Sequence, residues 1–207
     1  MIESVVNAVQ LILTALTAAL ALIFAITTRR REWLMTGLFA GTYFLGDLYW
    51  QLYLLFFGVT PEISYIPDLS WYASFLFLFL LLVQIGGGQK TRRPALFAIP
   101  VFTVGICIFF MKWGEYVSNI IYALLMTLIL WRSIGALIAM RKAEPENKRA
   151  IYVYAATLFF CAAEYCVWIS SCFWTGSTIA NPYFWFDAMT SLGFVAFLPA
   201  VRKAVSE

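Results

Sequence analysis

The sequence predicts an all-α integral membrane protein with seven transmembrane helices in a single domain. Of its 207 residues, 63% are hydrophobic and only 12% are charged, which is far more apolar than a soluble domain of this size. The apolar stretches are each about 20–25 residues long, enough to cross a hydrocarbon core of about 30 Å. The third observation is that the basic residues recur after every second apolar stretch.

The basic residues predict the orientation of the chain. Twelve of the fourteen Lys and Arg residues fall in four clusters: Arg29, Arg30 and Arg31; Lys90, Arg92 and Arg93; Arg141, Lys142, Lys148 and Arg149; and Arg202 and Lys203. Because cytoplasmic loops collect Lys and Arg, we expect the N-terminus outside, the C-terminus inside and the protein in the cytoplasmic membrane. The net charge of +3 then reflects these loops and does not predict a nucleic-acid partner.

The predicted spans follow one another with short connections. They are residues 4–27, 33–57, 68–86, 94–111, 116–140, 150–174 and 182–201. The first span precedes its basic residues, which favours a retained span over a cleaved signal peptide. Pro94 and Pro182 suit the first turn of a helix, and Gly86 suits the end of one. Pro100 and Pro199 fall inside spans, where we expect kinks.

A faint internal repeat divides the predicted domain, residues 1–207, into two triplets of helices. The first triplet covers residues 4–86 and the second covers residues 116–201, with residues 94–111 as a linking helix. The equivalent positions are Asn7 and Asn119, Asp47 and Glu164, Trp50 and Trp168, and Asp68 and Asp187. With one intervening span, the triplets run in the same direction, which predicts a parallel 3+1+3 repeat.

This 3+1+3 plan resembles the arrangement of SWEET-type sugar transporters, although the helices at 4–27, 33–57, 116–140 and 150–174 lack the prolines of those carriers. The step from Gly46 to Asp47, and its counterpart from Ala163 to Glu164, is also similar to the paired acidic positions of the lysoplasmalogenase membrane hydrolases. The chain lacks the histidine of that family. The first likeness implies a carrier and the second implies a hydrolase, and neither carries residue roles over to this chain.

Asp47 and Glu164 are the strongest candidates for a binding site. An ionisable group inside a span costs about 2.5–3.5 kcal/mol on insertion scales and usually faces the bundle interior or a cavity. Both lie at about 21 Å along their helices from the cytoplasmic start at 1.5 Å per residue. The structural alternative is that each is protonated or hydrogen-bonded as packing between helices. Arg132, the single basic residue inside a span, is expected either in an ion pair with a carboxylate of 33–57 or 150–174 or in substrate coupling.

Aromatic and amide side chains share the helical faces of these carboxylates. Tyr43, Trp50 and Gln51 lie three or four positions from Asp47, and Trp168 lies four positions after Glu164. Asp187 is a further candidate one turn into its helix, whereas Asp68 fits a helix-capping role. An ordinary interfacial belt is the alternative for the aromatic residues, and we assign Tyr65, Trp71 and Trp174 to it.

Carboxylates among Trp and Tyr rings form an apt site for an organic cation, through charge attraction and cation–π contact. The leading hypothesis is therefore a small-solute transporter, for an organic cation or another small polar metabolite, with proton coupling through the carboxylates. The alternatives are a ligand-sensing or partner-binding membrane protein and an intramembrane carboxylate-dependent lipid hydrolase.

The sequence predicts no metal and no other cofactor. It contains no histidine and four cysteines, Cys107, Cys161, Cys166 and Cys172, without a CxxC motif, so a zinc site is not expected. The cysteines are expected to pack as small apolar side chains. The expected partners are membrane lipids, a small-molecule ligand and, in a homo-oligomer, further copies of the chain.

Overall fold

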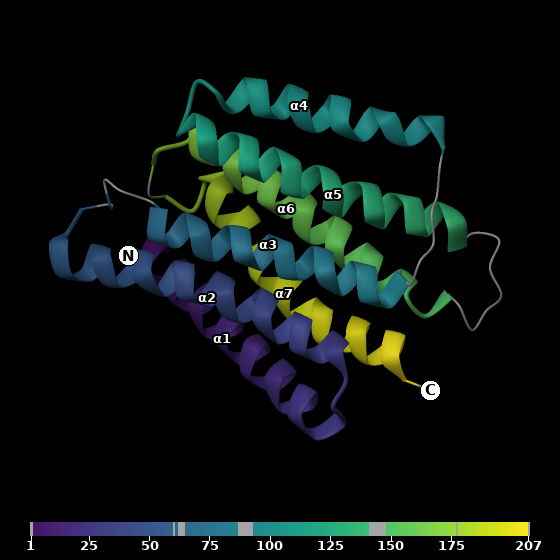
Figure 1. Cartoon of the computed structure of the whole chain (residues 1–207). Coiled ribbons are helices and arrows are strands. Elements are labelled where there is room, and N and C mark those ends of the chain that lie inside the picture. The colour runs from purple at the N-terminus through teal and green to yellow at the C-terminus, as the bar shows by residue number, and fades with distance from the viewer. Residues whose placement is uncertain are drawn as a thin grey trace.

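The structure is a computed structural model, and it describes residues 2–59, 61, 65–86, 93–140, 148–176 and 178–206 (Figure 1). Across these residues the regular structure is entirely helical, which confirms the predicted class. The elements are α1 (Ile2–Thr28), α2 (Arg31–Phe57), α3 (Tyr65–Gly86), the 3₁₀ helix η1 (Pro94–Phe97), α4 (Ala98–Phe110), α5 (Tyr116–Met140), α6 (Ile151–Phe173) and α7 (Pro182–Val205). The basic residues Lys90, Arg92, Arg141 and Lys142 lie outside the described residues.

Five of these helices, α1, α3, α5, α6 and α7, are long and apolar enough to cross a membrane. This finding supports a multi-pass membrane protein. The two exceptions have physical reasons. α2 is 27 residues long but is interrupted by polar and aromatic side chains. α4 has 13 residues, and even together with η1 the stretch Pro94–Phe110 is shorter than the other spans.

Local sequence sets several helix ends. The backbone at Gly58 is left-handed, with φ of 68°, and its N–H donates to the Leu54 carbonyl at the end of α2, the usual role of glycine at this position. At the start of α7, the Asn181 side chain accepts a hydrogen bond of 2.9 Å from the Tyr183 N–H, and Pro182 occupies the first turn. Both are standard N-terminal signals.

Six helices form a closed ring, and α4 lies outside it. α1 packs against α2 and α7, α3 packs against α2 and α5, and α6 packs against α5 and α7. α4 packs against α5 on the outer side of this ring (Figure 1). The chain ends lie at opposite ends of the bundle in Figure 1, as expected for an odd number of alternating helices.

The ring is filled by a cluster of aromatic side chains. Phe39 of α2 lies with its ring centroid 5.2 Å from Phe160 of α6 and 4.8 and 5.1 Å from Phe194 and Phe197 of α7. All four are fully buried. Because helices in lipid gain little from hydrophobic transfer, such close packing has to supply much of their association energy. Phe194 lies 4.7 Å from the ring of Tyr43, which connects this cluster to the site described next.

Candidate functional site

A cavity of about 310 Å³ lies inside the ring, and side chains from all six ring helices line it. The lining residues are Asn7, Gln10, Tyr43, Asp47, Trp50, Gln51, Asp68, Trp71, Phe75, Tyr122, Glu164, Val167, Trp168, Ser171, Tyr183 and Asp187. We call it the central cavity. All seven residues that the sequence predicted for substrate binding are among them.

Carboxyl groups from three helices meet in the central cavity: Asp47 of α2, Glu164 of α6 and Asp187 of α7. The Tyr43 hydroxyl donates a 2.9 Å hydrogen bond to Glu164 Oε1, which joins α2 to α6. Gln10 of α1 and Asp187 of α7 also line this space, and these two helices pack against each other. Glu164 and Asp187 are each only 3% exposed. The site therefore draws acidic groups from both halves of the chain.

Two of the carboxylate oxygens have no hydrogen-bond partner among the described residues. They are Oδ2 of Asp47 and Oδ2 of Asp187, and both atoms are buried. None of the described residues that line the central cavity is basic. A buried carboxylate oxygen without a donor costs several kcal/mol unless a cation or a proton compensates it. The arrangement thus suits a positively charged ligand.

The Asp47 carboxylate is oriented by Trp71 of α3. The indole Nε1 donates a 3.0 Å hydrogen bond to Asp47 Oδ1, and the Trp71 ring lies 6.1 Å from that of Trp50. Trp71, which the sequence assigned to the interfacial belt, therefore lines the site as well. Hydropathy and depth could not separate a belt Trp from one whose N–H turns inward to a carboxylate.

Gly46 makes this contact possible. A Cβ atom at position 46 would lie 2.7 Å from Trp71 Nε1 and 3.2 Å from the Pro67 carbonyl oxygen. Both approaches are too close, so only glycine lets α3 and its indole pack this tightly on α2.

We expect Gly46→Ala to displace the Trp71 indole and break its hydrogen bond to Asp47. The displaced indole no longer fixes the Asp47 carboxylate or contributes its ring to the cavity wall. A desolvated cation–π contact is worth about 2 kcal/mol, so affinity for a cavity ligand should fall at least about tenfold. Titration of purified protein with tetramethylammonium, followed by calorimetry, measures this. The matched control is Gly41→Ala on the same helix, where the new Cβ would meet Ala18 at an ordinary 3.7 Å. Equal affinities for the two variants would contradict the role assigned to Trp71.

Asp68 lies in the first turn of α3, where the sequence suggested a helix cap. Its carboxylate also reaches across to α5, because Ser118 Oγ donates a 3.0 Å hydrogen bond to Asp68 Oδ2. The Tyr72 hydroxyl donates in turn to Ser118 Oγ at 2.7 Å. Asp68 thus faces the central cavity as a fourth acidic residue, held by α3 and α5 together.

Aromatic rings form much of the cavity wall. Tyr122 of α5 lies 4.9 Å from Trp168 of α6 between ring centroids, and Tyr43 lies 6.4 Å from Trp71. Rings within about 6 Å of a cation stabilise it through their quadrupoles. The sequence did not identify Tyr122, Gln10 or Tyr183 as site residues. For Gln10 a signal existed, since it lies three positions after Asn7 and shares its helical face.

The structure does not bring Arg132 to this site. Its Nε lies 3.5 Å from the Leu82 carbonyl of α3, next to Tyr154, whose hydroxyl donates to the same carbonyl at 3.2 Å. Arg132 is not among the groups that act on Asp47 or Glu164, so the expected ion pair with either of them is not found. The charged end of a long Arg side chain lies well away from its own Cα atom. Residue spacing alone therefore does not show which groups it contacts.

The described residues contain no group of His, Cys, Asp and Glu side chains that could hold a metal ion. Searches against protein-family models, curated proteins and solved structures found no match to this chain, and its function is therefore inferred from the central cavity.

Proposed function

We propose that the protein is a membrane carrier for a small organic cation, which binds in the central cavity. The observation that carries this proposal is the convergence of Asp47, Glu164 and Asp187 on one aromatic-walled space, with no basic residue among the described residues that line it. Two buried oxygens, on Asp47 and Asp187, have no donor within the described part of the chain. An ammonium group placed there would gain charge attraction and cation–π contact together.

The arrangement of the ring supports a carrier. If α1, α2 and α3 are paired with α5, α6 and α7 in that order, the contact of α3 with α5 corresponds to the contact of α7 with α1, and both contacts are present. Under the same pairing, Asp47 of α2 corresponds to Glu164 of α6. We take this as a parallel repeat with α4 as the link, in which the two halves rock about the shared site. In this proposal all seven helices span the membrane, α2 and α4 included.

The basic clusters orient the carrier. Arg149 donates a hydrogen bond to the Ser206 carbonyl, and Lys203 lies 3.7 Å from the centroid of the Tyr152 ring, so the start of α6 and the end of α7 share one side. We assign that side to the cytoplasm of the cell membrane. The central cavity then lies toward the outer half of the bilayer, and a proton can replace the cation on the carboxylates during the return step.

Uptake of radiolabelled tetramethylammonium into proteoliposomes tests this function. We expect uptake by the wild-type protein and loss of uptake in Asp187→Asn. The control is Glu32→Gln, which removes a carboxylate in the first turn of α2, outside the central cavity. Saturable binding without uptake would contradict a carrier and favour the ligand-sensing alternative. Absence of both binding and uptake would reject the cation site itself.

A further inference from the structure

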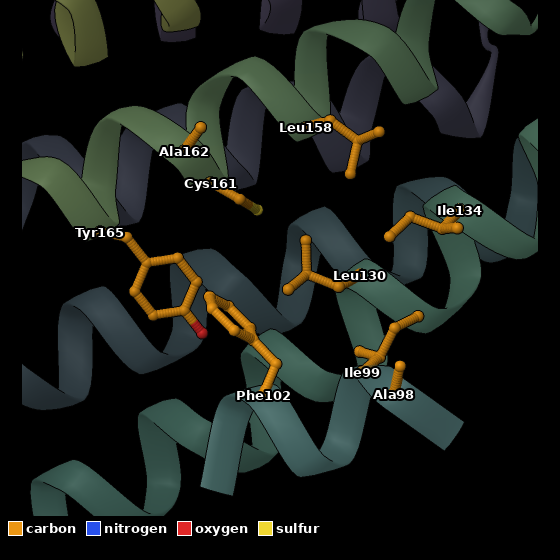
Figure 2. A pocket seen from close by; sticks show the side chains of 9 residues that line it. All are labelled: Ala98, Ile99, Phe102, Leu130, Ile134, Leu158, Cys161, Ala162 and Tyr165. Carbon is orange, nitrogen blue, oxygen red and sulfur yellow. The ribbon is translucent and has the colours of Figure 1, made fainter. Parts of the chain in front are cut away.

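Two more hollows lie beyond the central cavity, along the outer face of α5 between α4 and α6. The first, the outer chamber, has about 400 Å³. It is lined by Pro61, Asp68, Ile106, Cys107, Phe110, Trp113, Gly114, Glu115, Ser118, Asn119, Tyr122, Ala123, Tyr165, Trp168, Ser171 and Cys172. The second, the lateral groove, has about 400 Å³ and is lined by Ala98, Ile99, Phe102, Leu130, Ile134, Leu158, Cys161, Ala162 and Tyr165 (Figure 2).

The three hollows share walls. The outer chamber shares Asp68, Tyr122, Trp168 and Ser171 with the central cavity, and it shares Tyr165 with the lateral groove. Aromatic rings lie at each shared wall. Tyr122 and Trp168 lie 4.9 Å apart between centroids, and Phe102 and Tyr165 lie 5.7 Å apart. Figure 2 shows the Phe102 and Tyr165 rings side by side at one end of the groove.

Polarity falls steadily along this series of hollows. The central cavity holds three carboxylates besides Asp68, the outer chamber has mixed walls with Glu115 and Asn119, and the lateral groove is apolar apart from the Tyr165 hydroxyl. Such a gradient matches one kind of molecule, which has a positive head and an apolar tail. Charge complementarity fixes the head at the carboxylates, and the groove accepts the tail.

The groove faces outward from the ring, toward the position of lipid chains. Ala98, Phe102 and Ala162 are all exposed in the bundle. α4 packs mainly against α5, and it meets α6 through aromatic rings such as Phe102 and Tyr165. Leu158 lies ten positions before Trp168 on α6, which is about 15 Å at 1.5 Å per residue. A fully extended dodecyl chain together with its head group is about as long as this.

We propose that the ligand of the central cavity is an amphiphilic organic cation, such as a long-chain amine, whose alkyl chain lies in the lateral groove. This inference rests on the cation site proposed above and adds the class of substrate and its route. The ligand enters sideways from the bilayer between α4 and α6, and its head passes the Tyr122–Trp168 pair to reach the carboxylates. Its tail exchanges one apolar environment for another, so the head supplies the specificity.

Photo-crosslinking in nanodiscs tests the proposal. The probe is dodecyltrimethylammonium with a diazirine at the end of its chain, and the adducts are located by mass spectrometry. For the wild-type protein we expect adducts on α4, α5 and α6 near Ala98, Ile134 and Leu158. We also expect excess tetramethylammonium to displace them, because it competes for the head site.

Ala162→Phe fills the groove and should reduce these adducts at least about tenfold, while tetramethylammonium binding measured by calorimetry stays unchanged. The matched control is Ala19→Phe on α1, where the alanine is also exposed but lines none of the three hollows. Ala98→Phe repeats the test from the opposite wall if Ala162→Phe does not fold.

Adducts spread evenly over the lipid-facing helices, or groove adducts that tetramethylammonium does not displace, would overturn the amphiphile proposal. If tetramethylammonium still bound in a carboxylate-dependent way, the carrier proposal would stand. If tetramethylammonium did not bind to the wild-type protein at all, the cation site itself would be rejected and this inference with it.

Discussion

Replacement of Asp47 by Asn together with Glu164 by Gln is expected to remove at least about 99% of the cation affinity of the central cavity. A hydrogen bond or contact with a charged group contributes about 1.5–3 kcal/mol, so the loss of two corresponds to about 100-fold or more. Calorimetric titration with tetramethylammonium in nanodiscs measures the change. Each single variant should give an intermediate affinity, because Asp187 and one other carboxylate remain.

The double variant should remain folded. A buried amide is less costly in a membrane than a carboxylate, and the amide carbonyl that Glu164→Gln introduces can still accept the hydrogen bond from the Tyr43 hydroxyl. Its unfolding temperature should therefore not fall below that of the wild-type protein. Glu32→Gln, which removes one acidic group in the first turn of α2, is the control for loss of a carboxylate outside the central cavity. Wild-type affinity in a folded double variant would show that the ligand binds elsewhere.

Replacement of Phe39 by Ala is expected to give the largest loss of stability. Its ring is 0% exposed and contacts Phe160, Phe194 and Phe197. A Phe→Ala change in a close-packed core costs about 3–5 kcal/mol, because the neighbouring side chains collapse only partly into the space. Unfolding in mixed micelles measures this free energy.

Phe56→Ala on the same helix is the matched control. Phe56 is 73% exposed, so its removal should change stability by no more than about 0.5 kcal/mol. Similar losses for the two variants would mean that the aromatic cluster does not hold α2, α6 and α7 together.

The helices could be predicted because long apolar runs allow no other backbone structure in lipid. Residues 116–140 were predicted as a span, and α5 covers Tyr116–Met140. The start of α4 was harder to predict from the sequence. The chain forms the 3₁₀ helix η1 after Pro94, and apolar composition alone does not distinguish a 3₁₀ from an α-helical turn.

The site could be predicted in part because its charges follow helix geometry. Tyr43, Asp47, Trp50 and Gln51 share one face of α2, and a carboxylate inside a span is expected to face inward. Which residues of other helices meet that face depends on how the helices rotate against each other. Trp71 reaches Asp47 through the close approach at Gly46, and Tyr122 reaches the cavity through the contact between α3 and α5. Residue spacing within one helix predicts neither of these two contacts between helices.

A crystal structure of the protein with tetramethylarsonium, whose arsenic is located by anomalous scattering, tests the cation site most directly. We expect one arsenic peak between Asp47, Glu164 and Asp187, within about 6 Å of the Trp or Tyr ring centroids. A peak on the surface, or no peak in the central cavity under conditions where solution binding is saturated, would contradict it.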